Sequence, residues 1–383
     1  MCPPPCWPIG MAAPDRRAAF HSQAASPRIR RMTSTRARLL SLATAVPPHV
    51  LRQTDVAEMA STLFSERYGE FDRLSRVFAT TGIHKRHSVQ PIDWYMQARG
   101  WPERTAAYLR GAEDLFAEAA TKALDEAELL ARDVDAVVTV SSTGIATPSL
   151  EARVLQRLGL RHDVMRVPVF GLGCGGGVSG LAVASRLAES RPGSNVLFVT
   201  VELCTLAFRL DKLTKASIVA TALFGDGAAA CILRAGGDAG VAEVEATGDH
   251  TWPDTLDIMG WDVEEAGFGV IFARAIPPFA EANVGPAVLG LLKRWQLGPE
   301  QVDRFICHAG GTKVITALER SLAIGQGALD HERAVLSEFG NMSAPTVLFV
   351  LDRARKAGLP PRSVLTAMGP GFTASCASLR SPS

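Results

Sequence analysis

A repeated pattern of segments constrains the fold of this 383-residue chain more than any other feature of its sequence. The apolar segment that begins at Val134 resembles the one that begins at Val302, and the segment that begins at Val196 resembles the one that begins at Val364. The separations, 302 − 134 and 364 − 196, are both 168 residues. Because two matches share one offset, the sequence predicts a duplicated structural unit.

Each unit contains a strand, a glycine-rich loop, a helix and a second strand. The strands are short apolar runs rich in Val and Ile, which is typical of parallel sheets that are covered on both faces. In the last helix Ser343 can cap the N-terminus, and Gly358 follows the C-terminus. Alternating strands and helices form α/β layers. The sequence therefore predicts that the two units pack into a single five-layered αβαβα body built from two duplicated halves.

The chain is expected to divide into three parts. Residues 1–34 are rich in Pro, Arg, Ala and Ser and lack an apolar run, so we expect a disordered tail. The composition favours a tail without function, or a start codon placed too far upstream, over an import or export signal. Residues 35–238 form the N-terminal half and residues 239–383 form the C-terminal half, and neither half is expected to function alone.

Composition excludes several classes of function. The 40 Lys and Arg residues balance 39 Asp and Glu, so no global field attracts nucleic acid or an anionic membrane surface. The long uncharged stretch at 167–185 contains a proline and six glycines, which makes it unsuitable as a membrane span. Seven scattered cysteines indicate a reducing compartment, so we expect a cytoplasmic protein without membrane insertion. No metal site is expected, because neither Cys2 and Cys6 nor His84 and His87 have further ligands nearby.

Three predicted loops carry reactive side chains at the places where ligands bind in open parallel sheets, beyond the carboxyl ends of strands. Cys174 follows the strand predicted at 167–170, His308 follows the strand predicted at 305–307, and Asn341 lies in the loop before the last helix. By the repeat, Cys174 and Asn341 occupy nearly equivalent places in the two halves. We therefore expect these two residues to face each other.

The three residue types suit one kind of chemistry. Cys174 lies among glycines before a predicted helix, where the helix dipole and a nearby imidazole would make the thiolate accessible near neutral pH. His308 is then the expected base or oxyanion donor, and Asn341 donates a hydrogen bond without adding charge. Because a carboxylate would oppose an enolate, Cys with His and Asn points to thioester chemistry in which decarboxylation generates a carbanion.

The same glycine-rich loop permits a different hypothesis. Gly171-x-Gly173-x-x-Gly176 fits the dinucleotide-binding fingerprint, and Glu202 follows at the end of the next predicted strand. This pattern would indicate an NAD-dependent dehydrogenase. The hypothesis is disfavoured, because a Cys occupies the loop where pyrophosphate must approach and the other two reactive residues have no role.

Several motifs lie in consistent order between residues 39 and 379. They are the loop around Cys174, Ala222-Leu-Phe-Gly-Asp-Gly-Ala-Ala-Ala230, Cys307-His-Ala-Gly-Gly311, Leu336-Ser-Glu-Phe-Gly-Asn-Met-Ser343 and Gly369-Pro-Gly371. Together they resemble type III polyketide synthases, the chalcone synthase-like branch of the thiolase fold. The resemblance implies a thiolase-like fold and an acyltransferase that acts as a homodimer.

The resemblance also implies the roles of the site residues. An acyl-CoA starter would be loaded onto Cys174, and malonyl-CoA would be decarboxylated with help from His308 and Asn341. CoA thioesters would be the substrates and no cofactor would be required. Arg73 and Arg76 fall where the family places basic residues on CoA phosphates.

The expected pocket residues differ from those of plant chalcone synthases. Phe224 matches the family's gatekeeping Phe, and the other expected pocket residues are Thr143, Thr147, Cys204, Ala207, Trp261 and Val270. Val270 aligns with a second gatekeeping Phe of the plant enzymes, Cys204 and Ala207 with two threonines, and Thr147 with a Met. Most of these exchanges remove bulk, so we expect a wider pocket that accepts medium or long fatty acyl starters and gives alkylpyrone or alkylresorcinol products. Trp261 narrows the pocket elsewhere. A ketoacyl synthase III-like enzyme, which condenses only once, is the alternative within the same fold.

Overall fold

The computed structural model describes residues 35–382 except 66–68, 70, 213 and 238, and it leaves out the side chains of residues 72 and 73. The predicted tail, residues 1–34, lies outside the described residues. From Thr35 onward the chain forms one compact unit, which contains both predicted halves.

The strands of the two halves follow matching orders across the sheet. In the N-terminal half the order is β5 (Met165–Val169), β4 (Val134–Val140), β6 (Asn195–Leu203), β7 (Asp226–Ala235) and β1 (Ala37–Ala45). In the C-terminal half it is β11 (Arg304–Cys307), β12 (Arg362–Gly369), β13 (Thr373–Arg380) and β8 (Ala242–Thr251). Strand for strand, β4, β6, β7 and β1 correspond to β11, β12, β13 and β8, as the repeat predicts.

The directions of the strands correct one expectation. β4 pairs in parallel with β5 and β6, and β11 pairs in parallel with β12. β7, β1, β13 and β8 are joined by antiparallel pairing, so each half-sheet is mixed rather than wholly parallel. β1 and β8 pair through Arg38 with Glu243 and Leu39 with Ala242, which links the two half-sheets into one nine-stranded sheet.

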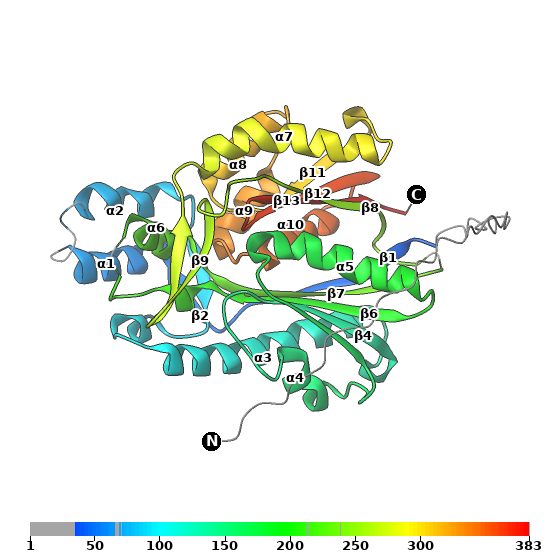
Figure 1. The fold of residues 1–383 in the computed structure, drawn as a ribbon, viewed down its shortest axis with the longest axis horizontal. Coiled ribbons are helices and arrows are strands. Elements are labelled where there is room, and N and C mark those ends of the chain that lie inside the picture. The colour runs from blue at the N-terminus through cyan, green and yellow to red at the C-terminus, as the bar shows by residue number, and fades with distance from the viewer. Residues whose placement is uncertain (1–34, 66–68, 70, 213, 238, 383) are drawn as a thin grey trace, which may run out of the picture. The chain divides into compact units, whose positions relative to one another are not determined.

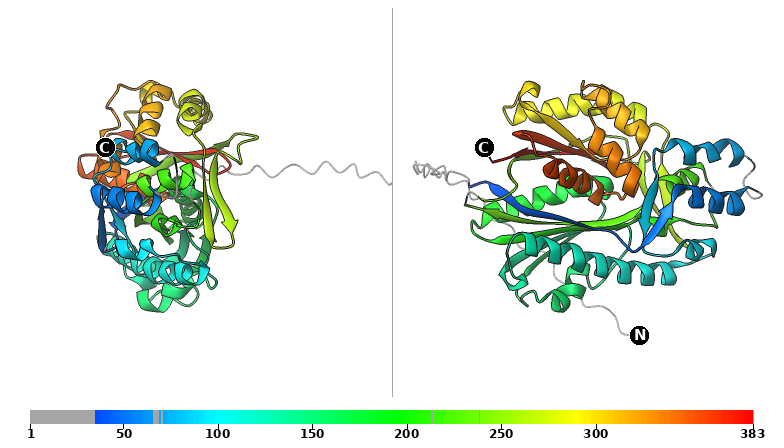
Figure 2. Two further views of the ribbon diagram at one scale, coloured as in Figure 1. Left: turned by 90° about the vertical axis from the view of Figure 1, so that its left-hand side faces the viewer. Right: turned by 180° about the vertical axis from the view of Figure 1, so that it is seen from behind.

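Helices form the other three layers (Figure 1). α5 (Gly176–Ser190) and α10 (Pro345–Lys356) lie between the half-sheets and contact strands of both. α3 (Trp101–Glu126) and α4 (Leu150–Leu158) cover the outer face of the N-terminal half, whereas α7 (Ile276–Arg294) and α8 (Thr312–Ser321) cover the outer face of the C-terminal half (Figure 2). The expected αβαβα layering is therefore confirmed.

The remaining elements surround the ends of the strands. The helices are α1 (Gln53–Phe64), α2 (Phe71–Thr80), α6 (Lys215–Leu223) and α9 (Asp330–Phe339), with short 3-10 helices η1 (Ile92–Met96), η2 (Ala131–Asp133), η3 (Gly173–Gly175), η4 (Cys204–Ala207) and η5 (Pro299–Gln301). Two hairpins, β2 (His49–Arg52) with β3 (Lys85–Ser88) and β9 (Met259–Glu264) with β10 (Gly267–Phe272), stand apart from the main sheet. No helix in the described parts of the chain is long and apolar enough to cross a membrane.

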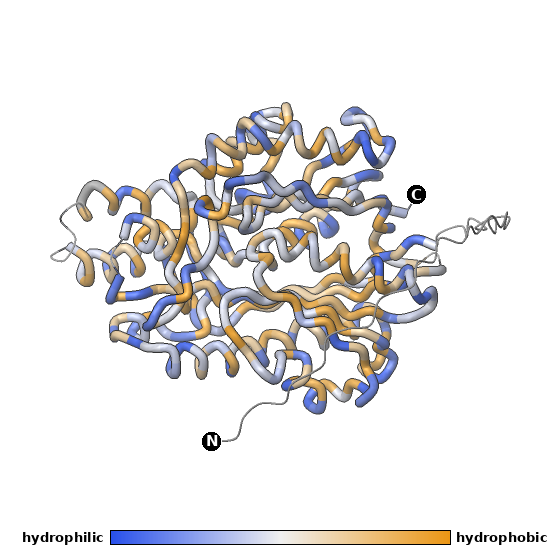
Figure 3. Tube along the Cα trace, viewed as in Figure 1, coloured by the Kyte–Doolittle hydropathy of each residue, from blue (hydrophilic) through white to orange (hydrophobic). Residues whose placement is uncertain are grey.

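The central helices are buried because apolar residues surround them. The strands of the N-terminal half are predominantly hydrophobic (Figure 3), and residues 347–351 of α10 are at most 5% exposed. α5 approaches its neighbours so closely that several positions admit only glycine. A Cβ on Gly177 would lie 2.3 Å from the carbonyl oxygen of Ala344, and one on Gly180 would lie 2.5 Å from the ring of Phe198. The glycine-rich stretch therefore serves close packing of α5 against α10 and β6.

Replacing Gly177 tests this close approach. Gly177→Ala places a methyl group against the Ala344 backbone, which cannot rotate away, so we expect a loss of about 1–3 kcal/mol in the free energy of unfolding. Gly290→Ala on α7 is the matched control. A Cβ there meets nothing within 4 Å, so helix propensity should make this variant about 0.5–1 kcal/mol more stable. Urea unfolding measures both, and equal midpoints for Gly177→Ala and the native protein would contradict the packing.

Candidate active site

Cys174 lies in η3, directly before the N-terminus of α5, as the sequence predicts. The loop that leads to it is held by Ser142, whose Oγ accepts hydrogen bonds from the backbone N–H groups of Gly171 (3.1 Å) and Gly173 (3.3 Å). Both glycines have positive φ, +92° and +47°, in the left-handed region that glycine adopts without strain. The end of β4, where Ser142 lies, therefore fixes the position of the thiol.

Asn341 is fixed through both its backbone and its side chain. Its N–H donates to the carbonyl of Leu223 (2.8 Å), and its carbonyl accepts from Gly225 N–H (3.0 Å). Its side-chain Nδ2 donates to the carbonyl of Gly310 (3.2 Å), while Oδ1 accepts from Ser343 N–H (2.8 Å). Because an amide nitrogen carries two hydrogens, one N–H remains for a further acceptor.

His308 follows β11 and is 3% exposed. Its backbone N–H donates to the carbonyl of Thr366 (2.8 Å), but neither ring nitrogen has a hydrogen-bond partner among the described residues. Buried polar atoms are nearly always hydrogen-bonded, so a buried imidazole without partners indicates a functional group that awaits a ligand. Burial also lowers the pKa of His308 to about 4.

Contacts through Ser343 and Gly310 bring the three predicted residues together. The side chain of Ser343 forms a hydrogen bond with Cys174, and its backbone N–H donates to Asn341. Asn341 in turn binds Gly310, where a Cβ would lie 3.4 Å from the His308 ring. The loops before α5 and α10 therefore meet, as their equivalent places in the repeat predict.

Ser343 has a different role from the expected one. It does not cap α10, whose N-cap residue is Ala344 without a side-chain cap bond. Instead Ser343 adopts a left-handed φ of +58° and contacts the thiol of Cys174. A non-glycine residue in this conformation is strained and is held by its surroundings, which is common at functional sites. A serine two positions after Asn341 is the sequence signal of this contact, although its pattern alone predicts a helix cap.

Electrostatics differ from the expectation of an accessible thiolate. Protein atoms surround the thiol of Cys174, and burial raises its pKa to about 11. Burial favours the uncharged form of both Cys174 and His308. The hydrogen bond from Ser343 favours the thiolate, but it is the smaller effect. Burial therefore opposes the accessible thiolate that the sequence predicts, and the stabilisation at the helix N-terminus stays a prediction.

Glu202 at the end of β6 is a buried carboxyl group that the sequence did not predict for this site. Its oxygens accept hydrogen bonds from the backbone N–H of Ser142 (2.9 and 3.0 Å) and from Thr143 Oγ1 (2.7 Å). Its charge acts on both Cys174 and Cys204, raising the pKa of each thiol. A charged residue at the end of an otherwise apolar strand was the signal that could have found it.

The structure brings most of the expected pocket residues close to this centre. Phe224 lies next to Asn341 through a backbone bridge, and its ring contacts that of Trp261 at 6.1 Å. Val270 pairs with Trp261 across the β9–β10 hairpin. Cys204 is buried and Ala207 partly buried in η4, whereas Thr147 is exposed on the loop after β4.

The expected CoA-binding residues lie on α2. Arg76 is exposed there, and the side chain of Arg73 lies outside the described residues. In the described residues no group of His, Cys, Asp or Glu side chains is arranged to hold a metal ion.

Arg86 on β3 is a second buried charge that the sequence did not single out. It is fully buried, and its guanidinium donates to the carbonyl of Phe224 (3.3 Å) and to Oε1 of Gln53 (2.5 Å). Burial lowers its pKa to about 9, and the carboxylate of Asp226 opposes this shift. Arg86 therefore fixes the backbone of the expected gatekeeper from behind.

A duplicated five-layered fold with Cys, His and Asn converging between its halves defines an acyltransferase of the thiolase fold. The chain belongs to the chalcone and stilbene synthases, the type III polyketide synthases: the family's N-terminal domain matches residues 25–237 and its C-terminal domain matches residues 243–382.

Similar proteins agree with this family. The chain is 40% identical over 345 residues to 1,3,6,8-tetrahydroxynaphthalene synthase of Streptomyces peucetius subsp. caesius, covering 88% of this chain and 91% of that protein. It is 29% identical to phloroglucinol synthase of Pseudomonas fluorescens, covering 86% and 95%. The crystal structure of 1,3,6,8-tetrahydroxynaphthalene synthase from Streptomyces coelicolor A3(2) superposes with a TM-score of 0.86 at 30% identity, covering 90% of this chain and 99% of that one.

The dehydrogenase hypothesis is therefore wrong, and the structure gives the physical reason. Two of the three glycines of the fingerprint, Gly173 and Gly176, pack against protein rather than leaving room for a pyrophosphate. A Cβ on Gly173 would lie 2.6 Å from Pro370, and one on Gly176 would lie 2.6 Å from Val140. Glu202 binds Ser142 and Thr143 instead of a ribose.

The protonation of Glu202 gives a testable pH dependence. Burial raises its pKa from 4.5 to about 7, so between these values the folded protein binds a proton that the unfolded chain has lost. This group therefore lowers stability as the pH rises through that window. Glu202→Gln cannot ionise, so we expect its stability relative to the native protein to increase from pH 5 to pH 7.5, by at most about 1.4 kcal/mol per pH unit.

Urea unfolding at the two pH values measures this difference. Glu58→Gln, on the exposed face of α1, is the control, and its stability relative to the native protein should be the same at both pH values. A constant difference between Glu202→Gln and the native protein would show that Glu202 is ionised across the whole range.

Proposed function

We propose that the protein loads a medium- or long-chain fatty acyl group from CoA onto Cys174, extends it with malonyl-CoA, and releases alkylpyrones or alkylresorcinols. The observation that carries the chemistry is the buried His308, whose ring nitrogens lack partners in the described structure, beside the loop of Asn341 that contacts Cys174. Two uncharged donors suit a reaction that places negative charge on a substrate oxygen. No cofactor beyond the CoA thioesters is required.

In the loading step the sulfur of Cys174 attacks the thioester carbonyl carbon of the starter. The C–S bond to CoA breaks, CoA leaves as its thiol with the proton of Cys174, and the acyl group remains on the enzyme. The raised pKa of Cys174 means that this proton must leave the thiol during attack rather than before it. Arg76, exposed on α2, is proposed to contact the phosphates of CoA.

In the condensation step malonyl-CoA loses its carboxylate as CO₂. The electron pair of the broken C–C bond forms the enolate of acetyl-CoA, and the enolate oxygen accepts hydrogen bonds from His308 and from the second N–H of Asn341. The enolate carbon then attacks the acyl carbonyl carbon on Cys174. The thioester bond breaks and the sulfur of Cys174 leaves as the thiolate. With a pKa of about 4, His308 is neutral at pH 7 and so donates one N–H.

Two features support a fatty acyl starter and one supports a different product. Cys204 in η4 is a small side chain near Cys174, Ala207 is a small side chain in the same 3-10 helix, and Val270 is small within the hairpin. By contrast, the 40% identical relative is a tetrahydroxynaphthalene synthase, so a fused aromatic product without an alkyl chain is the second candidate. Incubation with malonyl-CoA alone and with acyl-CoAs of increasing length separates the candidates by product mass. Products from malonyl-CoA alone, with no acyl starter accepted, would exclude the fatty acyl proposal.

The proposed roles predict separable defects in two variants. Cys174→Ala should abolish acylation of the protein, measured by intact mass after incubation with the starter. Asn341→Ala should retain acylation but release CO₂ from malonyl-CoA more slowly by about 10²–10³-fold, because one donor to the enolate is lost. Asn283→Ala, which removes only a hydrogen bond to the backbone of α7, is the control. Unchanged CO₂ release in Asn341→Ala would exclude the proposed enolate contact.

We also propose that two copies form a homodimer through the edge of β5. This strand is one of the two edge strands of the nine-stranded sheet, and Met165, Phe170 and the nearby Ile145 expose more than half of their surface. Apolar side chains beside an open strand edge are typical of an interface. Thr147 is exposed on the same loop as Ile145, so it would approach the partner chain.

Charge at this edge should separate the copies. Phe170→Asp places a carboxylate in the proposed interface, so we expect a monomer in sedimentation velocity where the native protein sediments as a dimer. Leu289→Asp, on the exposed surface of α7 in the other outer layer, should remain dimeric. A dimeric Phe170→Asp protein would place the interface elsewhere.

A further inference from the structure

The hairpin β9–β10 carries Trp261 and Val270 but belongs to no larger sheet. An isolated two-stranded hairpin is marginally stable, so its position depends on what it contacts. At one end Trp261 packs against Phe224, and at the other end the turn after Glu264 reaches the start of α3. Contacts at both ends therefore hold the hairpin, and those at the turn connect it to α3.

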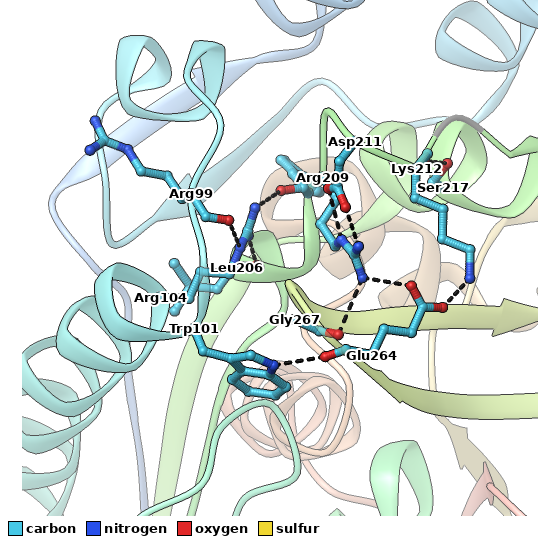
Figure 4. A network of polar contacts seen from close by, with 11 residues as sticks. Arg99, Trp101, Arg104, Leu206, Arg209, Asp211, Lys212, Ser217, Glu264 and Gly267 are labelled. Atoms are coloured by element: carbon cyan, nitrogen blue, oxygen red, sulfur yellow. Dashed lines mark hydrogen bonds and ion pairs between the residues drawn. The ribbon is translucent and has the colours of Figure 1, made fainter.

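Charged side chains hold this turn in place (Figure 4). Arg209 Nη1 donates to Glu264 Oε2 (2.8 Å) and to the carbonyl of Gly267 (3.2 Å), on the two strands that flank the turn. Arg209 also forms two hydrogen bonds with Asp211, and Lys212 pairs with the second oxygen of Glu264. We call Arg104, Arg209, Asp211, Lys212 and Glu264 the hairpin clamp.

The start of α3 contributes Arg104 to the clamp, and Trp101 beside it adds further contacts with the hairpin. Trp101 Nε1 donates to the carbonyl of Glu264 (2.8 Å), and its ring packs edge-on against Phe268 at 5.0 Å. Arg104 donates to the carbonyls of Leu206 and Phe208, which lie in and directly after η4. α3, η4 and the hairpin turn are therefore joined by one set of polar contacts.

The clamp connects two segments that carry expected pocket residues. η4 contains Cys204 and Ala207, and the hairpin contains Trp261 and Val270. Trp261 also stacks on Phe268, the residue that contacts Trp101, at 5.7 Å. A shift of the turn would thus be transmitted to Trp261 and would change the distance between the hairpin and η4.

The burial of Arg209 makes its ion pairs costly to break. The side chain of Arg209 is 6% exposed and that of Glu264 is 25% exposed. Removing a partner of the buried Arg209 leaves its charge less compensated, which is unfavourable, so the arginine holds the partly exposed carboxylate of Glu264 in place. Lys212 and Arg209 lower the pKa of Glu264, in agreement with a carboxylate that is ionised there.

We infer that the hairpin clamp determines which starters and products the pocket accepts, and that Arg209 and Glu264 are positioning residues that act through Trp261 and Val270. The inference rests on the proposed function only in assigning those residues to the substrate pocket. Neither side chain needs to touch the substrate. The clamp fixes the hairpin against η4 and so fixes the width between them.

The test compares Arg209→Met and Glu264→Gln with the native protein. Glu264→Gln keeps the shape of the side chain and removes the charge, so it remains informative if Arg209→Met does not fold. Hydrogen exchange in peptides that cover residues 259–272 should become at least about tenfold faster, while exchange in the central helices stays unchanged. Arg320→Met removes a surface ion pair with Glu281 and is the matched control.

Pocket width is read in two ways. The ratio of kcat/KM for long over short acyl-CoA starters should change at least about fivefold in both variants, with malonyl-CoA decarboxylation within about twofold of native. Labelling of Cys174 by N-ethylmaleimide and by a long-chain N-alkylmaleimide gives a second ratio that needs no polyketide synthesis. Arg209→Lys, which keeps the charge, should restore both ratios in part.

The outcomes are distinct. Faster exchange with both ratios unchanged would show that the clamp stabilises the hairpin without setting specificity, and unchanged exchange would show that the clamp does not hold the hairpin. Either result overturns the inference. If the native protein makes no polyketide from any starter, the proposed function fails, whereas the maleimide ratio and hydrogen exchange still decide whether the clamp sets the pocket.

Discussion

The contact between the backbones of α5 and α10 is the constraint around which this molecule is organised. Gly177 approaches the carbonyl of Ala344 so closely that no side chain fits, and both helices are enclosed by the two half-sheets. Cys174 directly precedes one helix and Asn341 lies shortly before the other, so the same contact that closes the core sets the spacing of the reactive groups. The close packing of the two helices and the spacing of the reactive groups therefore both depend on glycine in this stretch.

The sequence allowed much of this arrangement to be predicted, because duplication leaves a pattern that a single chain reveals. The shared offset of Val134 with Val302 predicted equivalent strands, and the motifs predicted Cys174 and its partners. The antiparallel strands were missed, since short apolar runs are alike in either direction. The protonation of Cys174 was also missed, because burial depends on what the other half of the chain places over the thiol.

The buried charged residues also show which features the sequence reveals and which require the fold. Glu202 and Arg86 are charged residues within strands, and each was visible in the sequence. Their roles were not, because their partners lie far along the chain: Glu202 holds Ser142, and Arg86 holds the carbonyl of Phe224. Local patterns predict elements and their order, whereas pairings across elements require the fold itself. The hairpin β9–β10 is a further example, since its contacts are with distant parts of the chain, such as Trp101 of α3 and Phe224.

The two half-sheets join directly through only two residue pairs, between β1 and β8. The strands of each half therefore pair mostly within their own half-sheet, and the proposed functions divide between the two halves. The N-terminal copy carries the thiol that would hold the acyl chain, and the C-terminal copy carries the imidazole and amide that would stabilise the carbanion. The two halves thus divide the proposed reaction between them, so that substitutions in one half can alter acyl transfer while the groups that would form the carbanion stay in place in the other.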